Sequence, residues 1–209
     1  MSSATSSPPP LLAGIDVERE YRTGPEVVRV LRGASVEIHA GEVVALVGAS
    51  GVGKSTLLHL LGALDRPSAG RVLFQGEDLF ARSEPALARY RRQDVGFVFQ
   101  FYNLLGDLTA LENAMVPAML QRAPAAEARE RAAVARALMN GPKAILADEP
   151  TGNLDPKTSA VIYDLFLQLQ AERGIAFLIA THNPDLARKA ERVYRLVEGR
   201  AREVDPSER

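Results

Sequence analysis

The stretch from Val43 to Thr56 reads VVALVGASGVGKST and decides the fold. Its first five residues are apolar, with no polar interruption, which predicts a strand buried on both faces. The residues from Gly48 onward fit the phosphate-loop pattern G-x-x-x-x-G-K-[ST]. An apolar helical run, 57–64, comes next. This order of strand, glycine-rich loop and helix is the context in which such a loop binds nucleotide phosphates.

Each residue type in this loop has a physical task on a bound triphosphate. Glycines permit backbone angles that a side chain would block, so successive N–H groups can point at phosphate oxygens. The helix N-terminus adds partial positive charge. Lys54 is expected to reach the β- and γ-phosphates, and Ser55 to hold Mg²⁺. The expected nucleotide-binding residues are Gly48, Ala49, Ser50, Gly51, Val52, Gly53, Lys54, Ser55 and Thr56.

Two acids end a second apolar strand. The run AILA at 144–147 is followed by Asp148 and Glu149. Ligands of open parallel sheets bind at the carboxyl ends of the strands, which is where these acids fall. Asp148 is therefore a candidate Mg²⁺ ligand, and Glu149 a candidate general base for an attacking water. The competing interpretation is that acids after a strand only mark the return of the chain to solvent.

Strands and helices alternate along the chain, which predicts an α/β fold with a largely parallel sheet covered on both faces. The expected strands are 14–21, 28–39, 42–47, 71–74, 95–99, 144–147, 176–180, 193–197 and 201–204. The expected helices are 57–64, 84–93, 109–121, 125–139, 156–173 and 184–190. The helix at 156–173 is expected to be amphipathic, with Val161, Ile162, Leu165, Phe166 and Leu169 on its apolar face.

The composition removes several classes of function. The 209 residues carry a formal charge of −1, which argues against a strongly basic nucleic-acid binder. There is no cysteine, so disulfides, thiol catalysis and cysteine-ligated zinc are excluded. No apolar run is long enough to span a membrane. Residues 1–13 are rich in Ser and Pro and have no basic start, which predicts a disordered tail and not a secretory signal.

Further motifs make the chain resemble a known family. Gln100 follows the strand VGFVF, TGNLD follows the two acids, and His182 follows the strand FLIAT. With the glycine-rich loop, these motifs resemble the ATP-binding subunit of an ABC transporter over Ile15–Val204. Three stretches are most similar to the lipoprotein-releasing branch: VGASGVGKSTLLHLLGALDRPSAG, FQFYNLLGDLTALENAMVPAML and ILADEPTGNLD. The macrolide-exporter and cell-division branches share many of these sequence motifs and remain alternatives.

The resemblance implies a fold, cofactors and an activity. The fold is a P-loop NTPase domain of the ABC type over residues 14–209, with a mainly parallel core sheet flanked by helices. An antiparallel β subdomain and a shortened helical subdomain, at about 101–140, complete it. The cofactors are ATP and Mg²⁺, and the activity is ATP hydrolysis coupled to transport.

The resemblance also assigns roles to single residues. Tyr21 matches the aromatic that stacks on adenine, against the alternative of an ordinary strand aromatic. Gln100 matches the glutamine that senses Mg²⁺ and the attacking water, against a capping or loop glutamine. His182 matches the histidine that contacts the γ-phosphate. Asp155 matches the acid that signals across a dimer, although its place before Pro156 also makes it a good helix N-cap.

Partners follow from the same resemblance. The apolar run Phe101–Leu105 matches the region that receives a short cytoplasmic helix of the membrane subunit, and exposed apolar side chains suit such docking. The alternative is an internal core segment. The implied partners are integral membrane permease subunits of the LolC/LolE type and a second copy of this chain, with no nucleic acid. The implied location is peripheral, on the cytoplasmic face of the bacterial inner membrane.

One family motif is missing from the sequence. The signature loop, close to LSGGQ, contains two adjacent glycines, and this chain has no Gly-Gly pair. Segments that precede and follow the signature in the family, RAPAAEARERAA and VARALMNGPKAILADEP, are joined directly near Ala132–Val134. We therefore expect one continuous helix over 125–139. A second function stays open: an ABC-type module that binds ATP but hydrolyses it poorly, because the facing clamp on the γ-phosphate is absent. A DNA-repair ATPase is disfavoured, because no long insertion interrupts the fold.

Overall fold

The buried strand ahead of the glycine-rich loop lies inside a six-stranded sheet. The computed structural model describes residues 8–99, 137–138, 140–152 and 156–205. Strand β3 (Val43–Val47) pairs in parallel with β8 (Ala176–Thr181) on one side and β9 (Arg192–Val197) on the other. The strand order is β10-β9-β3-β8-β7-β6, with β10 at Arg200–Val204, β7 at Ala144–Asp148 and β6 at Val95–Val98. Of these six strands only β10 is antiparallel to its neighbour, so the prediction of a largely parallel core sheet is confirmed.

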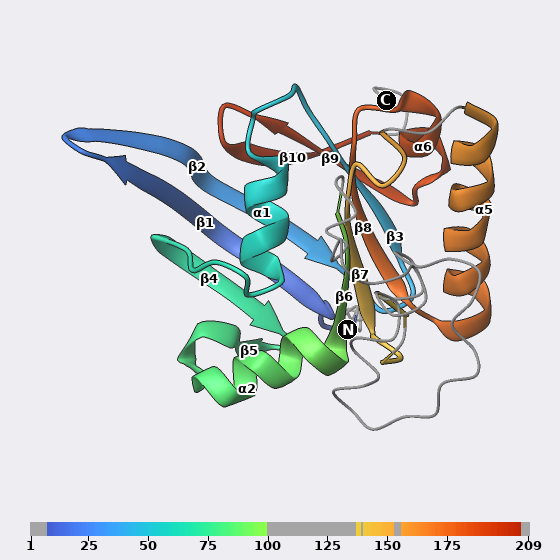
Figure 1. Cartoon of the computed structure of the whole chain (residues 1–209), viewed down its shortest axis with the longest axis horizontal. Helices are drawn as coiled ribbons and strands as arrows, with labels where there is room; N and C mark the ends of the chain where they lie inside the picture. The colour runs from blue at the N-terminus through green and yellow to red at the C-terminus, as the bar shows by residue number, and fades with distance from the viewer. Residues whose placement is uncertain (1–7, 100–136, 139, 153–155, 206–209) are drawn as a thin grey trace, which may run out of the picture.

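The second sheet contains four antiparallel strands in the order β2-β1-β4-β5. These strands span Leu12–Thr23 (β1), Glu26–Ile38 (β2), Ala69–Phe74 (β4) and Glu77–Asp78 (β5). β1 and β2 form a long hairpin that reaches away from the six-stranded sheet (Figure 1). This sheet corresponds to the expected antiparallel subdomain. β1 begins at Leu12, so the tail boundary expected at Ala13 falls inside this strand.

Helices cover both faces of the six-stranded sheet. The α-helices with described bounds are α1 (Lys54–Leu61), α2 (Glu84–Arg89), α5 (Pro156–Arg173) and α6 (Pro184–Lys189). A 3₁₀ turn at Leu79–Ala81 and a π-helical turn at Tyr90–Asp94 flank α2. Helix α1 lies between the two sheets, and α5 and α6 lie on the opposite side of the parallel sheet (Figure 1).

The alternation of side chains along β3 divides the interior into two clusters. Val44 and Leu46 pack in the cluster that contains the apolar residues of α1, including Leu57. Val43 and Ala45 pack in the cluster that contains Phe166 of α5. Both faces of β3 are therefore buried, as the uninterrupted apolar run predicts.

Two helical expectations need correction. Helix α1 begins at Lys54 and not at residue 57, because Gly53 adopts the left-handed conformation at the helix N-cap. Val161 of α5 is 52% exposed, so its expected burial is wrong. The buried side of that helix carries the predicted Phe166 and Leu169 and also Tyr163, which was not predicted. The helix expected at 109–121 lies outside the described residues, as does most of the one at 125–139, of which Ala137 and Leu138 are described as helical.

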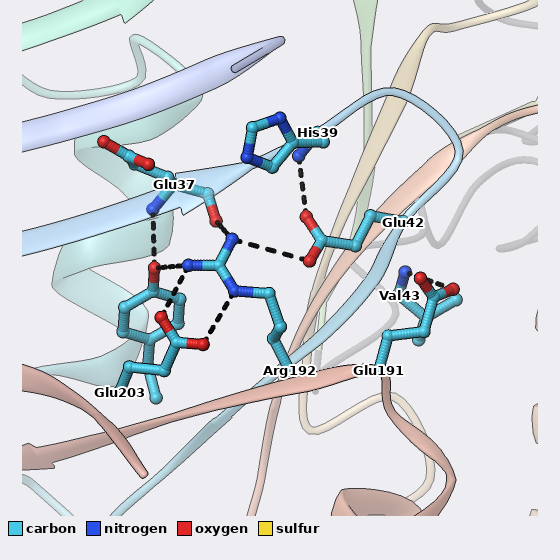
Figure 2. A network of polar contacts seen from close by, with 8 residues as sticks. Glu37, His39, Glu42, Val43, Glu191, Arg192 and Glu203 are labelled. Carbon is cyan, nitrogen blue, oxygen red and sulfur yellow. Dashed lines mark hydrogen bonds and ion pairs between the residues drawn. The ribbon is translucent and has the colours of Figure 1, made fainter. Parts of the chain in front are cut away.

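An arginine joins several strands at the amino end of β3 (Figure 2). The Nε and Nη2 atoms of Arg192 donate to the Glu203 carboxylate of β10, at 2.9 and 2.7 Å. Its Nη1 donates to the carbonyl of Glu37 on β2, at 3.4 Å, and to the buried Glu42, at 3.5 Å. The hydrogen bonds from Arg192 lower the pKa of Glu203. This network lies at the edge of the sheet opposite the glycine-rich loop, so it supports the fold and not the site.

The hydroxyl group of Tyr90 links α1 to the region of the second sheet, and its removal tests how much this one hydrogen bond contributes. Its ring is buried edge-on against Phe74, and its hydroxyl donates to the carbonyl of Leu61 at 2.8 Å. That carbonyl belongs to the last turn of α1, where no intrahelical donor is available. Removal of the hydroxyl therefore leaves a buried acceptor without its partner.

Tyr90→Phe should lower the free energy of unfolding by about 1 kcal/mol. For a chain of this size that corresponds to a loss of roughly 2–4 °C in Tm, measured by thermal unfolding followed by circular dichroism. Tyr21→Phe is the matched control, because the hydrogen bond of its hydroxyl is exposed and its loss should change Tm little. An unchanged Tm for Tyr90→Phe would show that this hydrogen bond contributes nothing to the packing.

Candidate nucleotide-binding site

The loop from Gly48 to Gly53 turns the chain from the sheet into α1 through conformations that only glycine tolerates. A Cβ at Gly48 would lie 2.6 Å from the carbonyl oxygen of Leu196 on the neighbouring strand β9. Gly51 and Gly53 have φ of +75° and +110°. L-amino acids other than glycine rarely adopt such angles. Glycine is therefore required by close approach at one end of the loop and by backbone conformation at the other.

Lys54 is held within this loop at the first position of α1. It is 7% exposed, and its Nζ donates to the carbonyls of Gly48 and Ala49 at 2.8 and 3.1 Å. The same Nζ lies 3.7 Å from the carboxylate of Glu149. The ammonium is thus oriented into the loop by backbone acceptors, with one carboxylate as its counter-charge.

Strands β7 and β8 bring the acids and His182 to the same edge. Asp148 is the last residue of β7, and His182 directly follows β8. Glu149 has a left-handed φ of 44°, and its N–H donates to the carbonyl of Ala180 at 2.9 Å. Its carboxylate lies 2.9 Å from Nδ1 of His182. Parallel strands end at a common edge, so residues far apart in the sequence meet beside the loop.

These side chains line one cleft of about 540 Å³. Nine of its ten lining residues belong to the set predicted from the sequence: Ser50, Gly51, Gly53, Lys54, Ser55, Thr56, Asp148, Glu149 and His182. The tenth, Val30 of β2, was not predicted. Val30 belongs to the other sheet. Its Cγ1 atom lies so close to the loop that a Cβ added at Gly53 would be 3.0 Å from it. No local pattern around Val30 signals it.

Other predicted residues do not line the cleft or lie outside the described part of the chain. Gly48 and Ala49 contribute the carbonyls that bind Lys54, and Val52 packs on the core. Tyr21 lies on β1, where its hydroxyl donates to Asp65 at 3.0 Å. Gln100, the run 101–105 and Asp155 lie outside the described residues. Their predicted roles stay predictions.

The cleft suits a phosphate chain better than a metal cage. Within the described residues no group of three or more His, Asp or Glu side chains could hold a metal ion. Ser55 and Asp148 both line the cleft and offer a hydroxyl and a carboxylate. These are the donors that Mg²⁺ accepts when phosphates complete its coordination. Lys54 and the N–H groups at the start of α1 supply positive charge for the phosphates themselves.

The fold and the loop define a P-loop nucleotide-binding protein. The sequence profile of the ABC transporter family matches residues 31–130. The chain is 42% identical to the lipoprotein-releasing system ATP-binding protein LolD of Paramagnetospirillum magneticum, covering 90% of this chain and 96% of that protein. It is 46% identical to LolD of Ruegeria pomeroyi, covering 93% and 97%. The chain therefore belongs to the ABC transporter family, as an ATP-hydrolysing transporter subunit.

Solved structures agree with this membership. The dimeric bacterial ABC transporter cassette MJ0796 superposes with a TM-score of 0.86 at 33% identity, covering 93% of this chain and 98% of the cassette. The same cassette bound to ADP and Pi, in a post-hydrolysis dimer, also gives a TM-score of 0.86, at 32% identity. The predicted ABC-type fold is confirmed. Within the described residues no helix is long and apolar enough to cross a bilayer.

The alignments also indicate that this chain is shorter than its relatives. The alignment with the Paramagnetospirillum protein has 217 positions, whereas 90% of 209 residues is about 188, so about 29 positions face a gap in this chain. The Ruegeria alignment has 224 positions and 93% coverage, which leaves about 30. A gap of this size agrees with the loss of a segment that contains the signature loop.

We expect Lys54 and Glu149 to affect ATP affinity in opposite directions. Lys54→Ala removes a charge-assisted contact and should weaken Mg-ATP binding roughly tenfold or more. Glu149→Gln removes the carboxylate that competes with phosphate for Lys54 and should strengthen binding roughly three- to tenfold. Isothermal titration calorimetry measures both.

The control for Glu149→Gln is Asp164→Asn, which makes the same charge change at an exposed ion pair with Lys189. Its affinity should match that of the unmodified protein. Unchanged affinity in Lys54→Ala would refute the assignment of this cleft as the phosphate site. Weaker binding in Glu149→Gln would refute the competition between carboxylate and phosphate.

Proposed function

We propose that this chain is the ATP-binding subunit of a membrane complex that releases lipoproteins from the bacterial inner membrane, and that it acts on the cytoplasmic face. The observation that carries the proposal is its similarity to lipoprotein-releasing ATP-binding proteins along 96–97% of their length. The cleft supports it, because Lys54, Ser55, Asp148, Glu149 and His182, to which we assign phosphate, Mg²⁺ and water contacts, all line it.

Binding of ATP uses charge that is already oriented. The β- and γ-phosphates would lie in the loop, where the N–H groups at the start of α1 and the Lys54 ammonium are their donors. Tyr21, on the β1–β2 hairpin, would stack on the adenine ring. Ser55 and Asp148 would hold Mg²⁺, which neutralises the phosphate oxygens when it is bound.

Hydrolysis requires Glu149 to change partners. In the structure its carboxylate pairs with both Lys54, at 3.7 Å, and His182, at 2.9 Å. A γ-phosphate gives the ammonium a stronger anion, which frees the carboxylate to accept a proton from the attacking water. Nδ1 of His182 faces the Glu149 carboxylate at 2.9 Å, so its Nε2 remains to contact the γ-phosphate. Gln100 would orient the water beside Mg²⁺, and Asp155 would transmit the state of the site across a dimer.

The partners in this proposal are integral permease subunits of the LolC/LolE type and a second copy of the chain. The permease would dock near Phe101–Leu105, an apolar run in the sequence. The dimeric state of the cassette MJ0796 supports the second copy as a partner. Energy from ATP would thus reach the membrane through protein contacts outside the nucleotide cleft.

We expect co-expressed permease subunits to be needed for recovery of this chain in the membrane fraction. Charge substitutions at Leu104 and Leu105 should release it from that fraction while ATP affinity is unchanged, because they affect docking and not the cleft. Leu64→Asp is the matched control, since Leu64 is an exposed leucine that does not belong to the predicted docking run. Membrane association without any permease, measured by fractionation and immunoblotting, would contradict the proposal.

A second candidate function follows from the missing signature loop. The absence of a Gly-Gly pair and the gap of about 29 alignment positions favour a chain that binds ATP but hydrolyses it slowly. Backbone donors aimed at the developing charge on the γ-phosphate would then be absent from the facing subunit. Loss of one such donor typically slows a reaction by about 10²–10³-fold.

For this second candidate function, hydrolysis should stay near background and ATP should induce no dimer, even in Glu149→Gln. Size exclusion with Mg-ATP and a phosphate-release assay measure the two properties. The control is a variant with the corresponding segment of the Ruegeria pomeroyi relative inserted after Ala133, which should dimerise and hydrolyse ATP. A stable dimer or rapid turnover without the insertion would exclude this candidate.

A further inference from the structure

Three side chains form a polar cluster beyond the C-terminal end of α1, and none of them lines the phosphate cleft. Arg19 and Tyr21 come from β1, and Asp65 comes from the loop that follows α1. We name this set the Asp65 cluster. Its contacts join the long β1–β2 hairpin to the helix that begins at the phosphate site.

Both carboxylate oxygens of Asp65 contact side chains of strand β1. Its Oδ1 lies 2.9 Å from Nη2 of Arg19, and its Oδ2 accepts from the hydroxyl of Tyr21 at 3.0 Å. The Arg19 guanidinium also lies over the Tyr21 ring, 4.5 Å from its centroid. The ring is therefore fixed at its hydroxyl end by the carboxylate and on one face by the cation.

The remaining surface of the Tyr21 ring is accessible. The residue is 38% exposed, although its hydroxyl and one face are occupied. A flat aromatic ring that is held in place and partly exposed suits stacking, because little conformational entropy is lost when a second ring binds. The neighbouring cross-strand residue, Val28, is also exposed, at 51%.

The orientation of Arg19 carries an energetic cost. Its Nε is buried and has no hydrogen-bond partner within the described residues. A buried donor without a partner typically costs a measurable part of the stability of a domain. An ordinary surface ion pair would leave this atom in water. The orientation is therefore set by the carboxylate and the ring, which is what a positioning role requires.

The loop that contains Asp65 is hydrogen-bonded to α1 as well as to β1. The N–H groups of Leu64 and Asp65 donate back to the carbonyl of His59 in α1. Ser68, in the same loop, bonds to the backbone of β1 twice: its N–H donates to Glu18 and its Oγ accepts from Glu20. The loop is therefore hydrogen-bonded to both the helix and the strand.

Helix α1 thereby connects two parts of one ligand site. Lys54 is its first residue, and Asp65 follows its last residue, Leu61, by four positions. An eight-residue α-helix is about 12 Å long. On the β2 side, Val30 lines the phosphate cleft, and Val28, the cross-strand partner of Tyr21, lies two residues earlier on the same strand. The phosphate site and the aromatic ring are thus joined through both α1 and β2.

We propose that Asp65 and Arg19 are positioning residues that orient the Tyr21 ring for the base of a bound purine nucleotide, so that the base-dependent part of the affinity depends on Asp65. The proposal rests on the proposed function, in which Tyr21 stacks on adenine. It adds the residues that hold the ring. It requires Asp65 to act on the base alone and not on the phosphates.

The test compares Mg-ATP with magnesium tripolyphosphate, which carries the phosphates without a base. Calorimetric titration of the full chain gives both affinities. Tyr21→Ala should weaken ATP binding roughly tenfold, the range of base–aromatic stacking, and leave tripolyphosphate binding unchanged. Asp65→Ala should weaken ATP binding roughly three- to fivefold and also leave tripolyphosphate binding unchanged.

A double variant separates positioning from general support of the fold. Asp65→Ala should have no further effect on ATP affinity in the Tyr21→Ala background, because its only route to the base is the ring. A residue that merely supports the fold would weaken binding in both backgrounds. Tyr21→Phe keeps the ring but removes the hydrogen bond to Asp65, so it should reproduce most of the Asp65→Ala effect.

Conservative variants cover the case in which Asp65→Ala fails to fold. Asp65→Asn keeps an acceptor for the Tyr21 hydroxyl and should retain most of the ATP affinity, whereas Arg19→Gln should lose part of it. If Tyr21→Ala leaves ATP affinity unchanged, the stacking role in the proposed function fails. If Tyr21→Ala weakens ATP binding but Arg19→Gln and Tyr21→Phe both leave it unchanged, the positioning inference alone is overturned. Equal losses for ATP and tripolyphosphate in the Asp65 variants would also overturn it.

Discussion

The close approach of Gly48 to the carbonyl oxygen of Leu196 is the constraint on which the rest of this structure depends. A side chain at this position would lie 2.6 Å from that oxygen and would push β3 and β9 apart at the edge where the site forms. Because glycine has no side chain, Gly48 can approach the Leu196 carbonyl this closely, and the chain can leave the sheet and enter α1 within a few residues. Lys54 then begins the helix with its ammonium directed back at the carbonyls of Gly48 and Ala49.

Much of this site was predictable because its residues occur in short, contiguous patterns with a fixed structural context. The loop from Gly48 to Thr56 follows a buried strand, and Asp148, Glu149 and His182 each follow another. The carboxyl ends of parallel strands meet at one edge, so the sequence alone indicates their convergence. The pairing of Glu149 with both Lys54 and His182 was not predictable, since it depends on side-chain geometry and on the left-handed backbone of Glu149.

The features that the sequence did not reveal involve the second sheet. Val30 reaches the cleft from β2, and its neighbour in that contact is Gly53, which is distant along the chain. Asp65 meets Arg19 and Tyr21 through a register between a loop and a strand that no local pattern encodes.

Val161 fits an apolar helical stripe but lies outside the surface that α5 presents to the sheet. Helical periodicity locates a face only approximately, and the packing partner decides which residues are buried.

The parallel pairing of β6 with β7 has a consequence for how this domain can vary in length. Two adjacent parallel strands cannot be joined by a hairpin, so the chain must cross from one end of the sheet to the other, which takes about a dozen residues. The connection from Val98 to Ala144 contains 45 residues, several times that minimum. The sheet therefore sets a lower limit on the length of this connection but no upper limit. A change in the length of this connection requires no change in strand order or register, so the segment can be shortened or extended in evolution independently of the phosphate loop.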